Sequence, residues 1–281
     1  MTKLLACIDA SPYANSVCDH AAWAAARLSA SVDVLHVIQR KDAVAARRDL
    51  SGAVGLGAKS GLLEELARID EETVRLAREQ GRLLLEAAET QLREAGIAVN
   101  LLHRHGGIVE TIIEREADAD VIVIGKRGAS ADFAKGHLGS KVERVVRASI
   151  RPVLVAARAF RPIKTVIAAF DNGPSAQKAV RFIADSPLFR DCTIRLVTAG
   201  TEAQRGALEA AARDISAGCA AVTAHLEAGN AEDVITRHMN EGGGDMLVMG
   251  AYGHSPLRNM IVGSTTTTMI RTCQVPVLLF R

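Results

Sequence analysis

The chain has 281 residues, 48% of them hydrophobic and 23% charged, which is typical of a globular protein with one large domain or two small ones. A net charge of +2 and an aromatic content of 3% argue against the basic or aromatic-rich surfaces that bind nucleic acids. No apolar run reaches the length of a membrane span and the first residues lack the pattern of a signal peptide, so we expect no membrane partner.

Five cysteines are scattered along the chain, and none belongs to a Cys-x-x-Cys pair. Their odd number and their spacing argue against a disulfide framework or a zinc site and favour a reducing, cytoplasmic location. They are Cys7, Cys18, Cys192, Cys219 and Cys273.

The first half of the chain alternates solidly apolar runs with segments of helical period. Such runs are typical of strands buried on both faces of a parallel sheet, and the periodic segments predict the helices that cover it. The expected strands are residues 3–8, 31–38, 98–104, 120–125 and 153–157. The expected helices are residues 13–29, 62–95, 108–117 and 139–148.

The long stretch between the second and third strands contains two segments of interest. Ser51 to Ser60 is rich in glycine but is not a P-loop, because Lys59 does not directly follow a glycine and no strand precedes it. We predict a loop there, with a flap over a ligand as the alternative. The following apolar residues predict one long amphipathic helix, or a coiled-coil seam interrupted at Gln80 and Gly81. They are Leu62, Leu66, Ile69, Thr73, Leu76 and Leu83.

The second half repeats the alternation without the long insertion. The expected strands are residues 163–170, 192–198, 219–225, 245–250 and 276–280. The expected helices are residues 174–185, 202–214, 231–241 and 263–271. Within the last helix, Thr265 to Thr268 form a run of β-branched residues, which suggests hydroxyls needed near a ligand or packing against the other half.

Four matched segments in the same order show that the two halves are copies of one unit. An apolar run that ends in Gly125-x-x-Gly128 recurs as one that ends in Gly250-x-x-Gly253, and the segment that ends in Asp9 recurs before Asp171. The offset falls from 162 to 125 between these matches, so the first copy holds 37 more residues. We therefore predict an α/β protein with two tandem doubly wound domains, residues 1–158 and 163–281. Each should have a five-stranded, mainly parallel sheet and about four helices.

The second copy carries the better-formed phosphate-type loop. Gly250 and Gly253 are followed after nine residues by Gly263 and Ser264, between an expected strand and an expected helix. Glycines allow a phosphate to approach the backbone, and a helix start offers it free N–H groups. Asp171 ends a strand at the same sheet edge and could accept a hydrogen bond from an adenine or a ribose. Its alternative role is to cap the next helix.

On these motifs the chain resembles a tandem universal stress protein, a family whose nucleotide motif is Gly-x2-Gly-x9-Gly-(Ser/Thr). The resemblance covers nearly the whole chain. It implies the adenine nucleotide alpha hydrolase-like fold, ATP (or AMP or ADP) as ligand, with or without Mg²⁺ beside ATP, and pairing of the last strands of two domains. Such pairing can occur within a tandem chain and leaves a further homodimer open. The ATP-binding residues that it implies are Ala169, Phe170, Asp171, Thr198 (or Val197), Met249, Gly250, Gly253, Gly263, Ser264 and Thr265.

The first copy departs from the family motif, because ten residues separate Gly128 from Gly139 and Lys141 replaces the second hydroxyl. A cluster of positive charge there could bind phosphates or could be a solvated surface; it comprises Lys126, Arg127, Lys135 and His137. The first copy therefore matches the family motif less fully than the second. The residues expected to contribute are Asp9, Val37, Gly125, Gly128, Gly139 and Ser140.

Several other residues have a structural interpretation. His103 and His105 share a strand face but lack a third ligand, and Cys7 is expected in the core. Glu110 and Glu232 are expected in the first turns of matching helices. No catalytic triad or carboxylate pair is evident. A non-catalytic nucleotide binder that acts as a stress sensor or regulator is thus the first hypothesis; a slow ATPase and an adaptor that binds no nucleotide are the alternatives.

Overall fold

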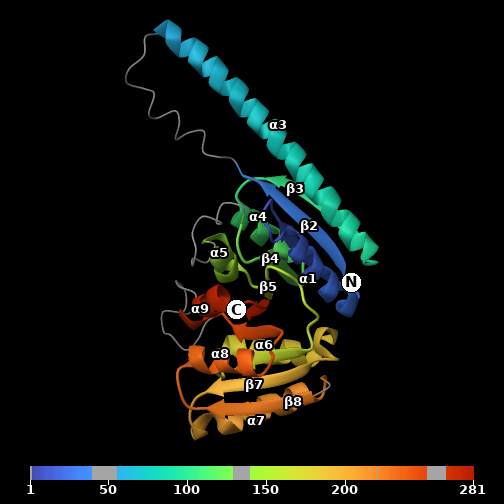
Figure 1. Ribbon diagram of the computed structural model, residues 1–281, viewed down its shortest axis with the longest axis vertical. Coiled ribbons are helices and arrows are strands. Elements are labelled where there is room, and N and C mark those ends of the chain that lie inside the picture. Colours follow the sequence, from blue (N-terminus) through green and yellow to red (C-terminus); the bar gives the residue numbers. More distant parts are fainter. Residues whose placement is uncertain (1, 40–55, 129–139, 220, 252–263) are drawn as a thin grey trace.

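The computed structural model describes residues 2–39, 56–128, 140–219, 221–251 and 264–281. Its ten strands form one sheet in the order β3-β2-β1-β4-β5-β10-β9-β6-β7-β8 (Figure 1). The two halves of the chain each supply five neighbouring strands. Both halves have the order 3-2-1-4-5 when their strands are numbered separately, as expected for duplicated doubly wound units.

In the first half the elements begin and end within a few residues of the predicted bounds, apart from the start of the long helix. The strands are β1 (Lys3–Ile8), β2 (Ser31–Ile38), β3 (Val99–His105), β4 (Val121–Gly125) and β5 (Val153–Ala156). The helices are α1 (Ala14–Leu28), α3 (Leu56–Glu94), α4 (Ile108–Arg115) and α5 (Ser140–Ala148), with a 3-10 turn at Glu116–Asp118.

The second half follows the same pattern. Its strands are β6 (Thr165–Ala169), β7 (Thr193–Ala199), β8 (Ala221–Glu227), β9 (Met246–Gly250) and β10 (Val277–Phe280). Its helices are α6 (Pro174–Asp185), α7 (Arg205–Ser216), α8 (Ala231–Glu241) and α9 (Ser264–Thr272), with 3-10 turns at Pro187–Phe189 and Glu202–Gln204.

Strands β5 and β10 join the two halves. They pair antiparallel, with Leu154 opposite Leu278, whereas every other neighbouring pair in the sheet is parallel. This is the pairing of last strands that the family resemblance led us to expect. Both leucines are buried, and each of the two hydrophobic cores contains residues from both halves, so the core is continuous across the junction.

The helices cover the sheet in two layers. The core on one face collects residues from α1, α3, α6 and α7, and the core on the other face collects residues from α4, α5, α8 and α9. Burial of both faces explains why the strands read as continuous apolar runs rather than as alternating ones.

Two cations reach across the junction to the ends of helices. Lys126 Nζ donates to the carbonyl of Cys273, which follows α9, at 2.5 Å, and Arg281 donates to the carbonyl of Ala148, the last residue of α5, at 3.1 Å. Each half thus supplies a positive charge to the negative end of the other half's last helix. Burial lowers the pKa of Lys126 to about 8.

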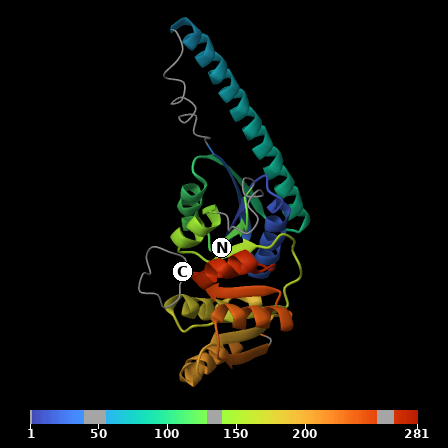
Figure 2. The same cartoon turned by 60° about the vertical axis from the view of Figure 1, so that its left-hand side comes forward.

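Helix α3 is longer than predicted and projects from the body of the protein (Figures 1 and 2). Residues 56–60, which we expected in a loop, belong to its first turns, whereas residues 51–55 lie outside the described residues. Only its C-terminal part packs on the sheet, and Ile69, Leu76 and Leu83 are each at least half exposed. Ion pairs between Glu and Arg three residues apart run along it. No helix in the described parts of the chain is long and apolar enough to cross a membrane.

The helix passes over two histidines at Gly81, which does not interrupt it. A side chain at Gly81 would lie 2.5 Å from His103 Nε2 and 2.7 Å from His36 Nδ1. Both nitrogens are buried and have no hydrogen-bond partner among the described residues. His36 comes from β2, so the structure places a third histidine beside His103 and His105 that the sequence pattern did not reveal. The three rings lie near one another, but the described residues contain no group of three His, Cys, Asp or Glu side chains that could hold a metal ion.

Because these histidines are partly buried, we predict that the stability of the protein toward urea depends on pH. Burial lowers the pKa of both His36 and His103. The neighbouring His103 lowers the pKa of His36 further, and His105 does the same for His103. At a pH between the lowered pKa of the folded state and the ordinary value near 6.5, these histidines bind more protons in the unfolded chain than in the folded one. We therefore expect the urea midpoint of unfolding to fall as the pH drops from 7.5 to 5.5. His103→Gln should partly remove this dependence, and an unchanged slope in that variant would contradict the assignment.

Candidate functional site

In each half the strand order reverses between the first and fourth strands, which is where α/β sheets bind ligands. In the first half the reversal lies between β1 and β4, and in the second between β6 and β9. Asp9 follows β1 and Gly125 ends β4, while Asp171 follows shortly after β6 and Gly250 ends β9. The structure thus brings each predicted aspartate to the same sheet edge as its predicted glycine.

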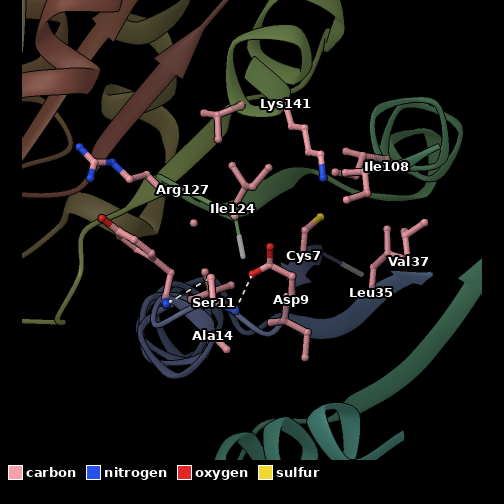
Figure 3. A pocket seen from close by; sticks show the side chains of 17 residues that line it. Cys7, Asp9, Ser11, Ala14, Leu35, Val37, Ile108, Ile124, Arg127 and Lys141 are labelled. Carbon is pink, nitrogen blue, oxygen red and sulfur yellow. Dashed lines mark hydrogen bonds between the residues drawn. The ribbon is translucent and has the colours of Figure 1, made fainter. Parts of the chain in front are cut away.

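The first half has a pocket at this edge (Figure 3). Its walls are mostly apolar, and Asp9 is the only carboxylate among the described residues that line it. The pocket volume is about 90 Å³, less than the roughly 300 Å³ of an ordinary ligand pocket, so it accommodates a ring-sized group. The side chains that form the walls include Cys7, Tyr13, Val17, Leu35, Val37, Ile108, Ile112, Ile124 and Val142.

Asp9 contributes to the local turn and also faces the glycine loop. Its Oδ1 accepts a hydrogen bond from the backbone N–H of Ser11 at 3.1 Å. Its Oδ2 lies so near Gly128 that a side chain there would approach it to 2.9 Å. A side chain at position 128 would therefore displace the Asp9 carboxylate, which lies beside the loop that follows β4.

The positive residues of the first-half loop do not act together. Lys126 turns to the junction between the halves, as described above, which corrects its grouping with possible phosphate ligands. Arg127 lines the pocket wall, and Lys141, from the first turn of α5, reaches into the pocket (Figure 3). Lys135, His137 and Gly139 lie outside the described residues, and of Ser140 only the backbone position at the start of α5 is described.

The second half places its aspartate in the same way. Asp171 Oδ1 accepts a hydrogen bond from the backbone N–H of Gly173 at 2.8 Å, the counterpart of the bond between Asp9 and Ser11. Gly173, not Asp171, is the N-cap of α6, so the alternative role as a helix cap does not apply. Gly250 packs so closely on α6 that a side chain would lie 2.9 Å from Ser175 Cβ. Ala169 and Met249 are register partners on β6 and β9.

The register of β7 adds a residue to those expected at its end. Cys7 pairs with Leu35 in the first half as Ala169 pairs with Val197 in the second. The counterpart of Val37 in the first-half pocket is therefore Ala199, a residue that the sequence did not single out. The ligand contact expected at Thr198 or Val197 stays a prediction. Thr198 faces the opposite side of the sheet, because side chains alternate along a strand. Its hydroxyl donates to the carbonyl of Phe170 at 2.8 Å.

One threonine of the run in α9, Thr266, has a structural role. Thr266 is buried, and its hydroxyl lies 3.2 Å from the carbonyl oxygen of Gly250 and 3.3 Å from that of Ala251. This contact ties the start of α9 to the end of β9. Ser264 is exposed and Thr265 is half-buried at the start of the same helix, while Gly253 and Gly263 lie outside the described residues.

The remaining candidates have structural roles. Glu110 and Glu232 lie in the first turns of α4 and α8, as predicted. Cys7 is half-buried in the pocket wall rather than fully enclosed in the core, and burial raises the pKa of its thiol above the usual range.

Comparison with known proteins agrees with this architecture. The model of the "Universal stress protein family" matches residues 1–157 and 197–281. The chain is 35% identical over 287 aligned positions to the universal stress protein Slr1230 of Synechocystis sp., with 100% of both chains covered.

Two solved structures share the tandem fold. A universal stress protein from Archaeoglobus fulgidus is 22% identical with a TM-score of 0.69, over 99% of this chain and 98% of that one. A protein of unknown function, PA1789 from Pseudomonas aeruginosa, is 19% identical with a TM-score of 0.65, over 100% of this chain and 92% of that one. At these identities the likeness concerns the fold.

Proposed function

The chain belongs to the universal stress protein family, and we propose that it binds adenine nucleotides at the sheet edge of its halves and acts as a nucleotide-dependent stress regulator. ATP, ADP and AMP share the adenosine part that such a site would hold. The observation that carries the proposal is the first-half pocket at the β1–β4 reversal, with mostly apolar walls and the carboxylate of Asp9 among the groups that line it.

The shape and chemistry of this pocket support an adenosine ligand. A ring-sized apolar cavity fits a base or a sugar, and a carboxylate accepts hydrogen bonds from an adenine amino group or from ribose hydroxyls. The phosphates would then lie at the mouth, near the loop after β4 and the start of α5. A helix start is favourable for an anion there.

We propose the same arrangement for the second half, around Asp171, Gly250 and the start of α9. Mg²⁺ would accompany ATP through the phosphates and water. Hydrolysis is not part of the proposal, because the described pocket residues include no carboxylate besides Asp9, whose Oδ1 already accepts a backbone hydrogen bond.

Replacement of Asp9 tests the first-half site. Asp9→Asn keeps an oxygen for the bond from Ser11 but replaces the other carboxylate oxygen with an N–H donor. We expect adenine-nucleotide affinity at this half to fall about tenfold to a hundredfold, as for the loss of a hydrogen bond to a charged group. Equilibrium binding of labelled ATP to the purified chain measures it, together with mass spectrometry of nucleotide released on denaturation.

Asp214→Asn is the matched control, because Asp214 is exposed on α7, away from both sheet edges. It should bind like the unmodified chain. If the unmodified chain neither releases nor binds adenine nucleotide at millimolar concentration, the proposed function is wrong. If Asp9→Asn and Asp214→Asn bind equally well, the placement of the first-half site is wrong.

A further inference from the structure

One cation in the first-half pocket is unexplained by the fold. Lys141 is the second residue of α5, and Figure 3 shows its side chain reaching into the pocket from that helix, with Asp9 on the opposite side. Its Nζ donates to Gln39 Oε1 at 2.6 Å. Gln39 directly follows β2, so this single hydrogen bond joins two elements that line the pocket.

The position of Lys141 is unfavourable for helix stability. The N-terminal turn of a helix carries the positive end of the dipole, where acidic side chains are preferred and cations are not. Glu143 lies in the same turn, but its carboxylate is paired with Arg147 at 3.0 Å. A lysine at this site is thus opposed by its own helix. An anionic group between Lys141 and the helix start would interact favourably with both.

The second half lacks this charge. The offset of 124 between the Gly-Ser segments places Thr265 at the position of Lys141. Thr265 is the second residue of α9; it is half-buried and carries no charge. The duplicated framework therefore differs at this point by one positive charge, which only the first half carries.

We infer that Lys141 makes the first-half site selective for a ligand with a phosphate group over the corresponding nucleoside. When the ligand binds, the ammonium exchanges the neutral amide oxygen of Gln39 for a phosphate oxygen, and charge-assisted hydrogen bonds of this kind are the stronger. This inference rests on the proposed function, because it assigns the phosphate end of the same adenine-nucleotide site.

Photoaffinity labelling of the full chain can measure the two halves separately. The probes are 8-azido-ATP and 8-azidoadenosine, and peptide mass spectrometry assigns each label to a half. The variants are Lys141→Thr, which copies the second half, Lys141→Arg, which keeps the charge, and Thr265→Lys, which transfers it. Unlabelled inorganic triphosphate as competitor distinguishes a free phosphate ligand from a nucleotide.

In the first half, Lys141→Thr should raise the half-saturating concentration of 8-azido-ATP about tenfold and change that of 8-azidoadenosine less than twofold. Lys141→Arg should keep the half-saturating concentration of 8-azido-ATP close to that of the unmodified chain. Labelling of the second half should be the same in all Lys141 variants, and Thr265→Lys should improve 8-azido-ATP labelling there.

Four outcomes would overturn the inference. Equal losses for both probes would mean that Lys141 only supports the fold of the pocket, and unchanged labelling would mean that it does not meet the phosphate. Competition by inorganic triphosphate as strong as that by ATP would mean a site for free polyphosphate. Absence of saturable labelling by either probe in the unmodified chain would instead reject the proposed function, and the inference with it.

Discussion

Leu278→Ala should lower the free energy of unfolding by about 2–5 kcal/mol, the range measured for truncation of large buried aliphatic side chains. Leu278 is 1% exposed and lies opposite Leu154 in the antiparallel pair of β5 and β10. The cavity would open in the core that the two halves share. Urea unfolding measures the effect, and we expect faster proteolysis of the connecting residues 157–164 as the halves separate more often.

Ile150→Ala is the control for this prediction. Ile150 is also a large aliphatic residue near the junction in sequence, but it is 73% exposed, so its truncation should change stability by no more than about 0.5 kcal/mol. Equal effects of the two substitutions would show that the halves do not depend on the core across β5 and β10.

Gly81→Ala should destabilise the protein by about 1–3 kcal/mol, the usual cost of overpacking a core. This sign is unusual, because alanine ordinarily stabilises a helix interior by roughly 1 kcal/mol relative to glycine. At Gly81 the added methyl group would lie within 2.8 Å of buried ring atoms of His36 and His103. The clash would push α3 off the sheet where it crosses β2 and β3. Urea midpoints at pH 7.5, where both imidazoles are neutral, give the measurement.

Gly206→Ala is the matched control, since Gly206 also lies in a helix, α7, and a side chain there would meet nothing within 4 Å. It should be neutral or slightly stabilising. If Gly81→Ala also stabilises the protein, then α3 is not held against the two histidines as the structure indicates. A second substitution, Gly81→Leu, should then be tolerated as well, which our prediction excludes.

The sequence predicted the tandem architecture and most element bounds because these depend on local signals. Strands buried on both faces need continuous apolar runs, and the duplication supplied each signal twice. The strand-end residues Asp9 and Asp171 were predicted at the sheet edge for the same reason: parallel strands end together. The sequence did not single out Ala199 as the counterpart of Val37, because only the pairing of β6 with β7 fixes which residue of β7 corresponds to it.

The sequence by itself determined the fold class, the repeat and the position of the glycine and aspartate motifs, all of which follow from periodicity and spacing along the chain. Only the tertiary structure decided how the positive charges are used. Lys126 follows β4 and Lys141 lies in the first turn of α5, yet one binds the end of α9 across the junction and the other enters the pocket. The third histidine beside His103 likewise became visible only once β2 and β3 were paired. Contacts between elements distant in sequence leave no periodic signal, because they depend on how helices pack on the sheet rather than on neighbours along the chain.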